Sequence, residues 1–342
     1  MIQKKFFFLI FKHRFRRRAL NNFIKIKKIK NYHIFDLTGF FKYYFFGKIL
    51  IFFISKLEKF FENFILISCD LKPFIKKNGV NIWFGGTSYK VPNEYKLFKN
   101  NCFVFENFSK KEENLINLYP FDPIEPVISK NPSVVFVGSF NIIEDQLIDK
   151  IWDVEKDKIL NDLTIIDKFE FWEKYNLDKD KRLQAHYIQL KERVRFNLIL
   201  NIKKNLKDKF IVVGTKWKEH VSDAKEDEFN ELKIKELYNG QICIDFGSKW
   251  GSNIFYPRSV EIIESGGFLL QLKQNNSSSN LYKLDAINEF DSLENCITKL
   301  NKLIFDNNFF KKKLENQFKF FSNKELNYET LNQIYEISKK NN

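Results

Sequence analysis

The chain has 342 residues, of which 44% are hydrophobic, and a formal net charge of +14. This length is enough for two domains that each bury a core. No apolar run approaches the roughly 20 residues of a membrane-spanning helix, and the six-residue run Phe6–Phe11 is followed by arginines without a small-residue cleavage site, so we expect neither a transmembrane segment nor a cleavable signal peptide. We therefore expect a cytoplasmic protein.

The four cysteines, Cys69, Cys102, Cys243 and Cys296, lie far apart and form no C-x-x-C motif. This spacing indicates neither a zinc site nor a disulfide framework, so we expect buried thiols. His13, His186 and His220 also lack metal-ligand spacing. We expect no metal site.

The basic excess is concentrated at the N-terminus. Residues 1–60 contain 15 Lys and Arg against two acidic residues, whereas the remainder is nearly neutral. We interpret residues 1–35 as a basic N-terminal extension. In the apolar segment 39–67, four lysines share one side of a helix; they are Lys42, Lys48, Lys56 and Lys59. Such a helix suits the anionic inner face of the plasma membrane, where the protein would be peripheral.

Two alternatives remain for this basic segment. The apolar side of the helix could pack inside the N-terminal domain, with its lysines merely solvated. The other alternative is that the basic segment binds the phosphates of a nucleic acid. We rank this interpretation last and do not favour nucleic acid as a partner, because no RNP, zinc-finger or helix-turn-helix signature accompanies the charge.

Residues 36–126 have the pattern of a small α/β domain. Short apolar strands at 64–68, 81–84 and 102–106 alternate with segments of helical composition at 71–78 and 92–100, which predicts βαβ units. Three prolines between Tyr119 and Pro126 interrupt any regular element and predict an interdomain hinge.

Residues 127–342 have the pattern of a second α/β domain. Leu190, Val194, Leu198, Ile202 and Leu206 recur every four residues and predict a helix over 189–209, which leads into a strand at Phe210. Strands are predicted at 242–246 and 268–272, as buried members of a parallel sheet. Between them, Pro257 and Gly266-Gly267 predict a helix from 257 to 264.

Arg258 and Glu261 are three residues apart on this short helix and share a face. A guanidinium at a helix N-terminus, reached through the Gly-rich loop 247–253, favours a phosphate. Glu261, one turn further on, could accept hydrogen bonds from a ribose or sugar hydroxyl. The alternative is a surface ion pair on an ordinary crossover helix.

The segment YPRSVEIIESGGFLLQ, residues 256–271, resembles the R-x-x-E-x-x-x-x-G-G-F-L-L stretch of the CgeB-like, spore-maturation glycosyltransferases of the GT-B superfamily. Residues 133–139 (SVVFVGS) resemble the strand and turn that open the donor domain of that family, and residues 210–217 (FIVVGTKW) its central strand and G-x-x-W turn. Leu237-Tyr238-Asn239 also fits, and residues 290–336 are similar to the closing helices, so the resemblance covers about residues 130–336 with a group 1-like C-terminal domain.

The resemblance implies an α/β, GT-B-like fold with two Rossmann-like domains facing a cleft, the N-terminal one being reduced and on the acceptor side. It implies a metal-independent, hexosyltransferase-type enzyme of polysaccharide biosynthesis. The donor would be a nucleotide sugar, which is a substrate, so no cofactor is expected. The acceptor would be a cell-surface glycan or lipid-linked. The alternative is a non-catalytic glycan- or nucleotide-binding subunit on the same fold.

Carried over residue by residue, the resemblance assigns roles in donor binding. Arg258 would stabilise the leaving diphosphate and Glu261 would contact the ribose or donor sugar. The backbone of Gly138 and Ser139 would approach the donor, above a floor made by Gly214, Thr215, Lys216 and Trp217. The loop residues Gly251, Ser252 and Asn253 would complete the site. Asn253 stands where the related E-x7-E retaining enzymes have their first Glu, so inverting and retaining outcomes both remain open.

A general base would come from the N-terminal domain. Candidates are His33, Asp36 and Asp70, the last of which follows the strand at 64–68, because residues after strand carboxyl ends line ligand sites in open α/β sheets. For each of them a capping or ordinary surface role is the alternative.

Overall fold

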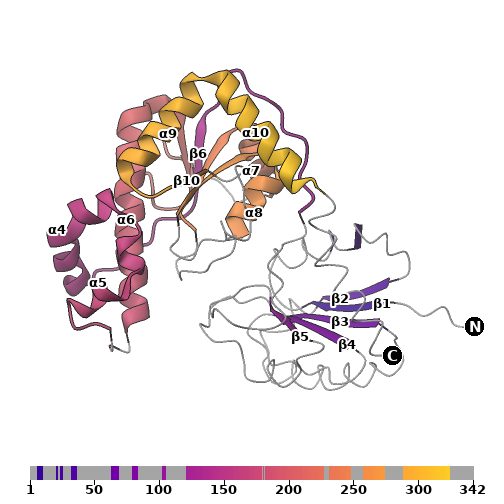
Figure 1. The fold of residues 1–342 in the computed structure, drawn as a ribbon, viewed down its shortest axis with the longest axis horizontal. Coiled ribbons are helices and arrows are strands. Elements are labelled where there is room, and N and C mark those ends of the chain that lie inside the picture. Colours follow the sequence, from indigo (N-terminus) through magenta and orange to yellow (C-terminus); the bar gives the residue numbers. More distant parts are fainter. Residues whose placement is uncertain are drawn as a thin grey trace, which may run out of the picture. The chain divides into compact units, whose positions relative to one another are not determined.

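The computed structural model divides the chain into two compact units, one of Met1–Asp122 with Asn323–Asn342 (unit 1) and one of Pro123–Ser322 (unit 2). It describes residues 6–10, 21, 24–25, 32–36, 63–68, 79–83, 102–104, 121–178, 180, 182–226, 231–247, 257–273 and 288–323. Each unit contains a five-stranded sheet (Figure 1). The expected fold class, α/β with two Rossmann-like domains, is confirmed.

All neighbouring strands of unit 1 are parallel, in the order β2-β1-β3-β4-β5. The strands are β1 (Phe6–Ile10), β2 (Tyr32–Asp36), β3 (Asn63–Ser68), β4 (Gly79–Trp83) and β5 (Cys102–Val104). The last three are the strands predicted at 64–68, 81–84 and 102–106.

The interpretation of residues 1–35 as an extension outside the sheet is wrong. Residues Phe6–Ile10 form β1, which pairs with β2 on one side and with β3 on the other. The run FFFLI is apolar on both faces of a strand, as a central parallel strand requires. With β1 and β2 the sheet of unit 1 has as many strands as that of unit 2. The predicted basic helix with Lys42, Lys48, Lys56 and Lys59 lies outside the described residues, apart from its last part, which belongs to β3.

The sheet of unit 2 is also entirely parallel, in the order β10-β9-β8-β6-β7. Its strands are β6 (Val134–Val137), β7 (Phe210–Val213), β8 (Ile242–Asp245), β9 (Phe268–Leu272) and β10 (Asn288–Phe290). Numbered within the unit, this order is 2-1-3-4-5, the flavodoxin-like version of a doubly wound sheet. Unit 1 has the same order.

The helices of unit 2 are α4 (Gln146–Asn161), α5 (Phe169–Glu173), α6 (Leu183–Leu206), α7 (Glu231–Tyr238), α8 (Pro257–Glu264), α9 (Leu293–Phe305) and α10 (Asn307–Phe321), with 3-10 turns η3 (Ile165–Asp167) and η4 (Lys207–Lys209). Helix α8 has the predicted bounds, and α6 with η4 covers the predicted helix over 189–209. Helices α4 and α5 lie beside the N-terminal part of α6 (Figure 1). None of the described helices is long and apolar enough to cross a membrane.

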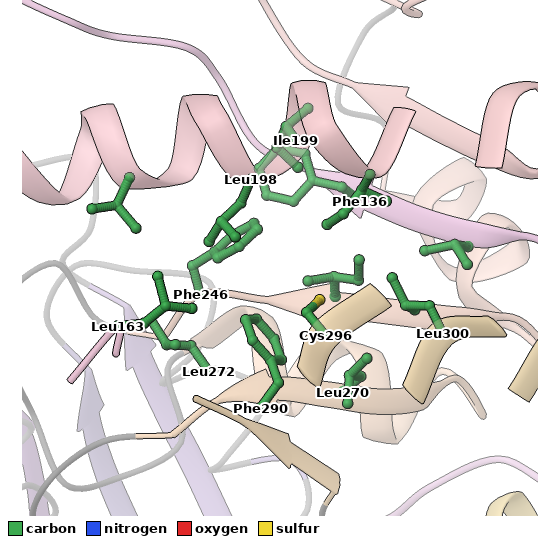
Figure 2. Packing of buried hydrophobic residues seen from close by; sticks show 14 of the residues in the cluster. Phe136, Leu163, Leu198, Ile199, Phe246, Leu270, Leu272, Phe290, Cys296 and Leu300 are labelled. Atoms are coloured by element: carbon green, nitrogen blue, oxygen red, sulfur yellow. The ribbon is translucent and has the colours of Figure 1, made fainter. Parts of the chain in front are cut away.

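The core of unit 2 lies between its sheet and the helices α6 and α9 (Figure 2). Leu198 and Ile199 of α6 face Phe136 and Phe246 there, while Leu300 of α9 closes the other side. Side chains alternate along a strand, so Val134 and Phe136 of β6 point into this cluster and Val135 and Val137 to the opposite face. Both faces of β6 are therefore buried, as expected for a central strand.

The segment that enters unit 2 is fastened to the turns at the start of β8 and β9. The amide of Ile124 donates to the Glu264 carbonyl at 3.1 Å, and the Val127 amide donates to Asn239 Oδ1 at 2.7 Å. Gly240 has φ +66° and lies so close to this entering segment that an added Cβ would be 1.8 Å from the Val127 carbonyl oxygen. Residues 124–127, which include the end of the proline-rich segment, thus belong structurally to unit 2.

Candidate functional site

The carboxyl ends of β6 and β8 form the topological switch point of the unit 2 sheet. In open α/β sheets, ligands bind outside the carboxyl ends of the strands at this point, because the chain leaves the two neighbouring strands toward opposite faces. The register pairs β6 with β8 only through Val134–Ile242 and Val135–Cys243. The last two residues of each strand lie beyond this pairing, at the edge where a ligand would be bound.

Gly138, which directly follows β6, lies against the guanidinium of Arg258. A Cβ built on Gly138 would be 3.2 Å from Arg258 Nη2 and 2.9 Å from Cζ of Phe136. The guanidinium carbon also lies 5.8 Å from the centre of the Phe136 ring. The Arg258 side chain is 20% exposed. Two predicted site residues, 120 positions apart in the sequence, are therefore in contact, and only glycine leaves room for that contact.

Asp245 is a residue of this site that the sequence analysis missed. It ends β8, is fully buried, and lies with Oδ1 at 3.5 Å from Arg258 Nη1. Its Oδ2 accepts a hydrogen bond from the Ser259 hydroxyl, and its Oδ1 accepts one from the Gly247 amide at 3.3 Å. The available signal was an acidic residue at the carboxyl end of an otherwise apolar strand, which is where ligand sites of parallel sheets lie.

The exits of β6 and β7 are held together by backbone hydrogen bonds. The Gly138 amide donates to the Val213 carbonyl at 2.8 Å and the Phe140 amide to the Thr215 carbonyl at 3.1 Å. Gly214 has φ +146°, and a Cβ there would lie 2.2 Å from the Gly138 carbonyl oxygen. Gly214 therefore permits the close approach of the two exits rather than contact with a ligand.

Trp217 packs against the junction between the exits of β6 and β7. Its indole Nε1 donates to the Gly138 carbonyl at 2.5 Å, and the side chain is fully buried. The ring meets Phe136 edge-on, with 5.8 Å between ring centres. The prediction that Trp217 lines the floor of a ligand pocket is corrected here: a fully buried indole has no face left for a ligand, and it holds the Gly138 turn instead.

Ser139 is exposed, and its carbonyl accepts a hydrogen bond from Arg195 Nη2 at 2.6 Å. The amides of Gly138 and Phe140 both point toward β7, where they donate to the Val213 and Thr215 carbonyls. Within the described part of the chain, no acceptor receives the Ser139 N–H.

Thr215 and Lys216 are exposed at the exit of β7. Lys216 has φ +66°, and its amide donates to Glu226 Oε1 at 3.0 Å. A non-glycine residue in this left-handed region is uncommon and marks a constrained turn.

Glu261 lies half-buried on α8, one turn after Arg258. Burial raises the pKa of the Tyr238 hydroxyl well above its ordinary value; the charge of Arg258 opposes this rise, and those of Glu261 and Asp245 add to it.

Several predicted residues are not placed at this site. Gly251, Ser252, Asn253 and Asp70 lie outside the described residues. Asp36 is the last residue of β2 in unit 1, where only the backbone is described. Cys243 and Cys296 are free and buried, as predicted. The described residues contain no group of three or more His, Cys, Asp or Glu side chains that could hold a metal ion.

No protein-family model and no curated protein matches the chain. Among solved structures it is similar to a glycosyltransferase from Rickettsia africae ESF-5, with a TM-score of 0.44 and 10% identity over 99% of both chains. It is also similar to TarM, with a TM-score of 0.36 and 9% identity, and to the pneumococcal O-GlcNAc transferase GtfA in complex with UDP and GlcNAc, with a TM-score of 0.39 and 10% identity. For both, 84% of this chain is covered, and the chain spans 54% of TarM and 60% of GtfA. These similarities are weak, so we base the function on the residues at the ends of β6 and β8.

Proposed function

We propose that the chain is a glycosyltransferase that holds the diphosphate of a nucleotide-sugar donor at the carboxyl ends of β6 and β8. The observation that carries this proposal is the contact between Gly138 and the Arg258 guanidinium at the switch point of a 2-1-3-4-5 parallel sheet. The resemblance of residues 256–271 to the CgeB-like motif supports the same assignment, since it names Arg258 and Glu261 as donor contacts.

The described groups suit a diphosphate in both charge and geometry. Arg258 offers a cation in the first turn of α8, whose N-terminal amides favour an anion. The backbone of Gly138 and Ser139 would approach the donor, and Glu261 would accept hydrogen bonds from the ribose or sugar. These donors would stabilise the charge that develops on the leaving diphosphate.

We propose that this stabilisation is metal-independent. The oxygens of Asp245, the carboxylate nearest to Arg258 among those described, already face Ser259, Gly247 and Arg258. The cation that offsets the diphosphate charge would then be Arg258 itself.

The acceptor side is also a proposal. A cell-surface glycan or a lipid-linked acceptor would bind through unit 1, with Asp36 or Asp70 as the candidate general base and with Gly251, Ser252 and Asn253 completing the donor loop. The basic residues of 1–60 would hold the protein at the inner face of the membrane. Hexosyl transfer in polysaccharide biosynthesis is the corresponding cellular role.

A second candidate is a non-catalytic glycan- or nucleotide-binding subunit. It is favoured by Asn253 at the position where the related retaining enzymes have a Glu. A panel of nucleotide sugars distinguishes the two: thermal stabilisation together with donor hydrolysis supports the enzyme, and thermal stabilisation without hydrolysis supports the subunit.

The donor site is tested by titrating UDP and GDP into Arg258→Ala. Loss of a charged hydrogen bond of about 1.5–3 kcal/mol should weaken binding about 10- to 150-fold. Because Arg258 faces the buried Asp245, we also expect a lower melting temperature, and Arg258→Lys, which keeps the charge without the fork, should give an intermediate affinity.

The matched control is Arg182→Ala, which removes an exposed arginine paired with Asp180 at the start of α6. It should leave the affinity unchanged. Unaltered UDP and GDP affinity in folded Arg258→Ala would rule out this donor site.

A further inference from the structure

Asp245 ends β8 at the switch point and holds two consecutive residues of the first turn of α8. Side-chain alternation turns it toward the face of the sheet that α8 covers, and it has no exposed surface. One carboxylate oxygen accepts from the Ser259 hydroxyl, and the other faces Nη1 of Arg258 at 3.5 Å. The Asp245 carboxylate therefore contacts both the start of α8 and the Arg258 guanidinium.

The two terminal nitrogens of Arg258 have different surroundings. Nη1 faces Asp245, whereas Nη2 lies 3.2 Å from the position of a Cβ on Gly138. With Nη1 beside the carboxylate, Nη2 lies on the side of the Gly138 backbone. A separation of 3.5 Å is longer than the roughly 2.7–2.9 Å of a charge-assisted hydrogen bond, so Asp245 orients the guanidinium by charge without enclosing it.

We propose that Asp245 is a positioning residue that sets the Arg258 guanidinium for the diphosphate of the donor. This inference rests on the proposed function, because it concerns the same site. For the effect of neutralising Asp245 on diphosphate affinity, a positioning role and simple charge repulsion predict opposite results. A carboxylate acting only through space would repel a diphosphate, so its neutralisation would tighten binding. A positioning carboxylate must weaken binding when it is neutralised, and only while Arg258 is present.

A double-mutant cycle on the full chain separates these possibilities. With UDP and GDP as probes, we expect Asp245→Asn to lower the affinity about tenfold in the presence of Arg258 and less than about twofold in Arg258→Ala. Tighter binding by Asp245→Asn would show through-space repulsion and overturn the proposal. Equal losses in both backgrounds would also overturn it, since Asp245 would then act independently of Arg258.

Asp245 is fully buried, so Asp245→Asn could fail to fold. Ser259→Ala provides a second variant, since it removes one hydrogen bond to the carboxylate and retains the charge. It should weaken UDP or GDP binding about two- to fivefold, again only when Arg258 is present. The matched control is Ser322→Ala, whose hydroxyl donates to the Phe318 carbonyl at the end of α10.

The failure of this inference is distinguishable from the failure of the proposed function. If Arg258→Ala binds both nucleotides as the unaltered chain does, the donor site itself is wrong. If Arg258→Ala weakens binding while Asp245→Asn and Ser259→Ala do not, the donor site stands and Asp245 has no positioning role.

Discussion

At the scale of single residues, the site depends on two glycines that allow backbone and side chains to approach closely. Gly138 leaves space for the Arg258 guanidinium and the Phe136 ring, and Gly214 leaves space for the Gly138 carbonyl. A Cβ added at these two positions would meet different groups. At Gly138 these are two side chains, the Arg258 guanidinium and the Phe136 ring, whereas at Gly214 it is a peptide group that Trp217 and the β7 exit hold in place.

We predict opposite consequences for the two substitutions. Gly138→Ala should displace the Arg258 side chain and lower UDP or GDP affinity about tenfold or more, with a smaller loss of stability, because its Cβ would meet the side chains of Arg258 and Phe136 rather than a peptide group. Gly214→Ala should destabilise unit 2 by more than about 2 kcal/mol, because φ +146° and a 2.2 Å approach to a backbone oxygen both exclude a Cβ. Thermal unfolding and nucleotide titration of both variants test this; a Gly138→Ala protein with full affinity would contradict it.

The residues of the site were only partly predictable from the sequence. Arg258 and Glu261 were found because proline and glycine mark the ends of their helix, which is a local signal. Asp245 was missed because its partners Arg258 and Ser259 lie 13 and 14 positions away, across a loop. Trp217 was misassigned because a tryptophan after a glycine turn reads equally well as a ligand contact or as a buried support.

At the scale of elements, strands and helices with periodic apolar patterns were predictable, and β1 was not. In helix α6 the five predicted apolar positions recur at intervals of four, and all of them are less than 10% exposed. The run Phe6–Ile10 is flanked by lysines and arginines, which favoured a free basic segment. Its partners, β2 and β3, lie more than 20 and 50 residues away, and no local pattern reveals such pairing.

Helices α4 and α5 are joined through a buried carboxylate, which gives a prediction about pH. Glu155 of α4 is 3% exposed, and it accepts hydrogen bonds from Lys174 and, at 2.7 Å, from the Tyr175 hydroxyl. The hydrogen bond from Lys174 holds the pKa of Glu155 below its ordinary value of 4.5. A lowered pKa in the folded state means stability that is present above about pH 4.5 and lost as the pH falls through the folded-state value.

We therefore expect Glu155→Gln to reduce the free energy of unfolding at pH 7 by about 1–3 kcal/mol. The difference from the unaltered chain should shrink as the pH falls below about 4.5. Denaturant unfolding at pH 7, 5 and 3 measures this, with the exposed Asp153→Asn on the same helix as the control. A difference that stays constant down to pH 3 would show that the carboxylate charge has no part in joining the two helices.

At the scale of the whole molecule, the basic N-terminus contains two of the five strands of the unit 1 sheet. Residues 1–60 hold almost all of the net charge, and they include β1 and β2. Removing them to test membrane binding would therefore remove an edge strand and the interior strand beside it. Membrane binding is better tested by substituting charged side chains, which leaves the strands in the chain.

We predict that the full chain sediments with anionic vesicles and not with neutral ones. Each lysine near the surface should contribute about 1 kcal/mol, declining as salt shortens the screening length. Lys→Glu at positions 42, 48, 56 and 59 should release the protein, whereas Lys→Glu at four exposed positions of unit 2, namely 150, 156, 311 and 312, should not. Equal release by both sets would show a response to net charge alone, and equal binding to neutral vesicles would favour a helix packed in the core of unit 1.

The central position of β1 has a further consequence during synthesis on the ribosome. A strand made from the first ten residues has no partner on its β3 side until residue 68 has been made. In that interval an aromatic strand with unpaired edges is prone to pair with other chains. Lys4, Lys5 and Lys12 flank it in the sequence, and charges at such positions oppose aggregation. Translation arrested before residue 63 should therefore yield more aggregated nascent chain when these lysines are replaced by glutamine, and the effect should vanish for chains arrested well after residue 68; the lysines would then protect the nascent chain whatever they later contact.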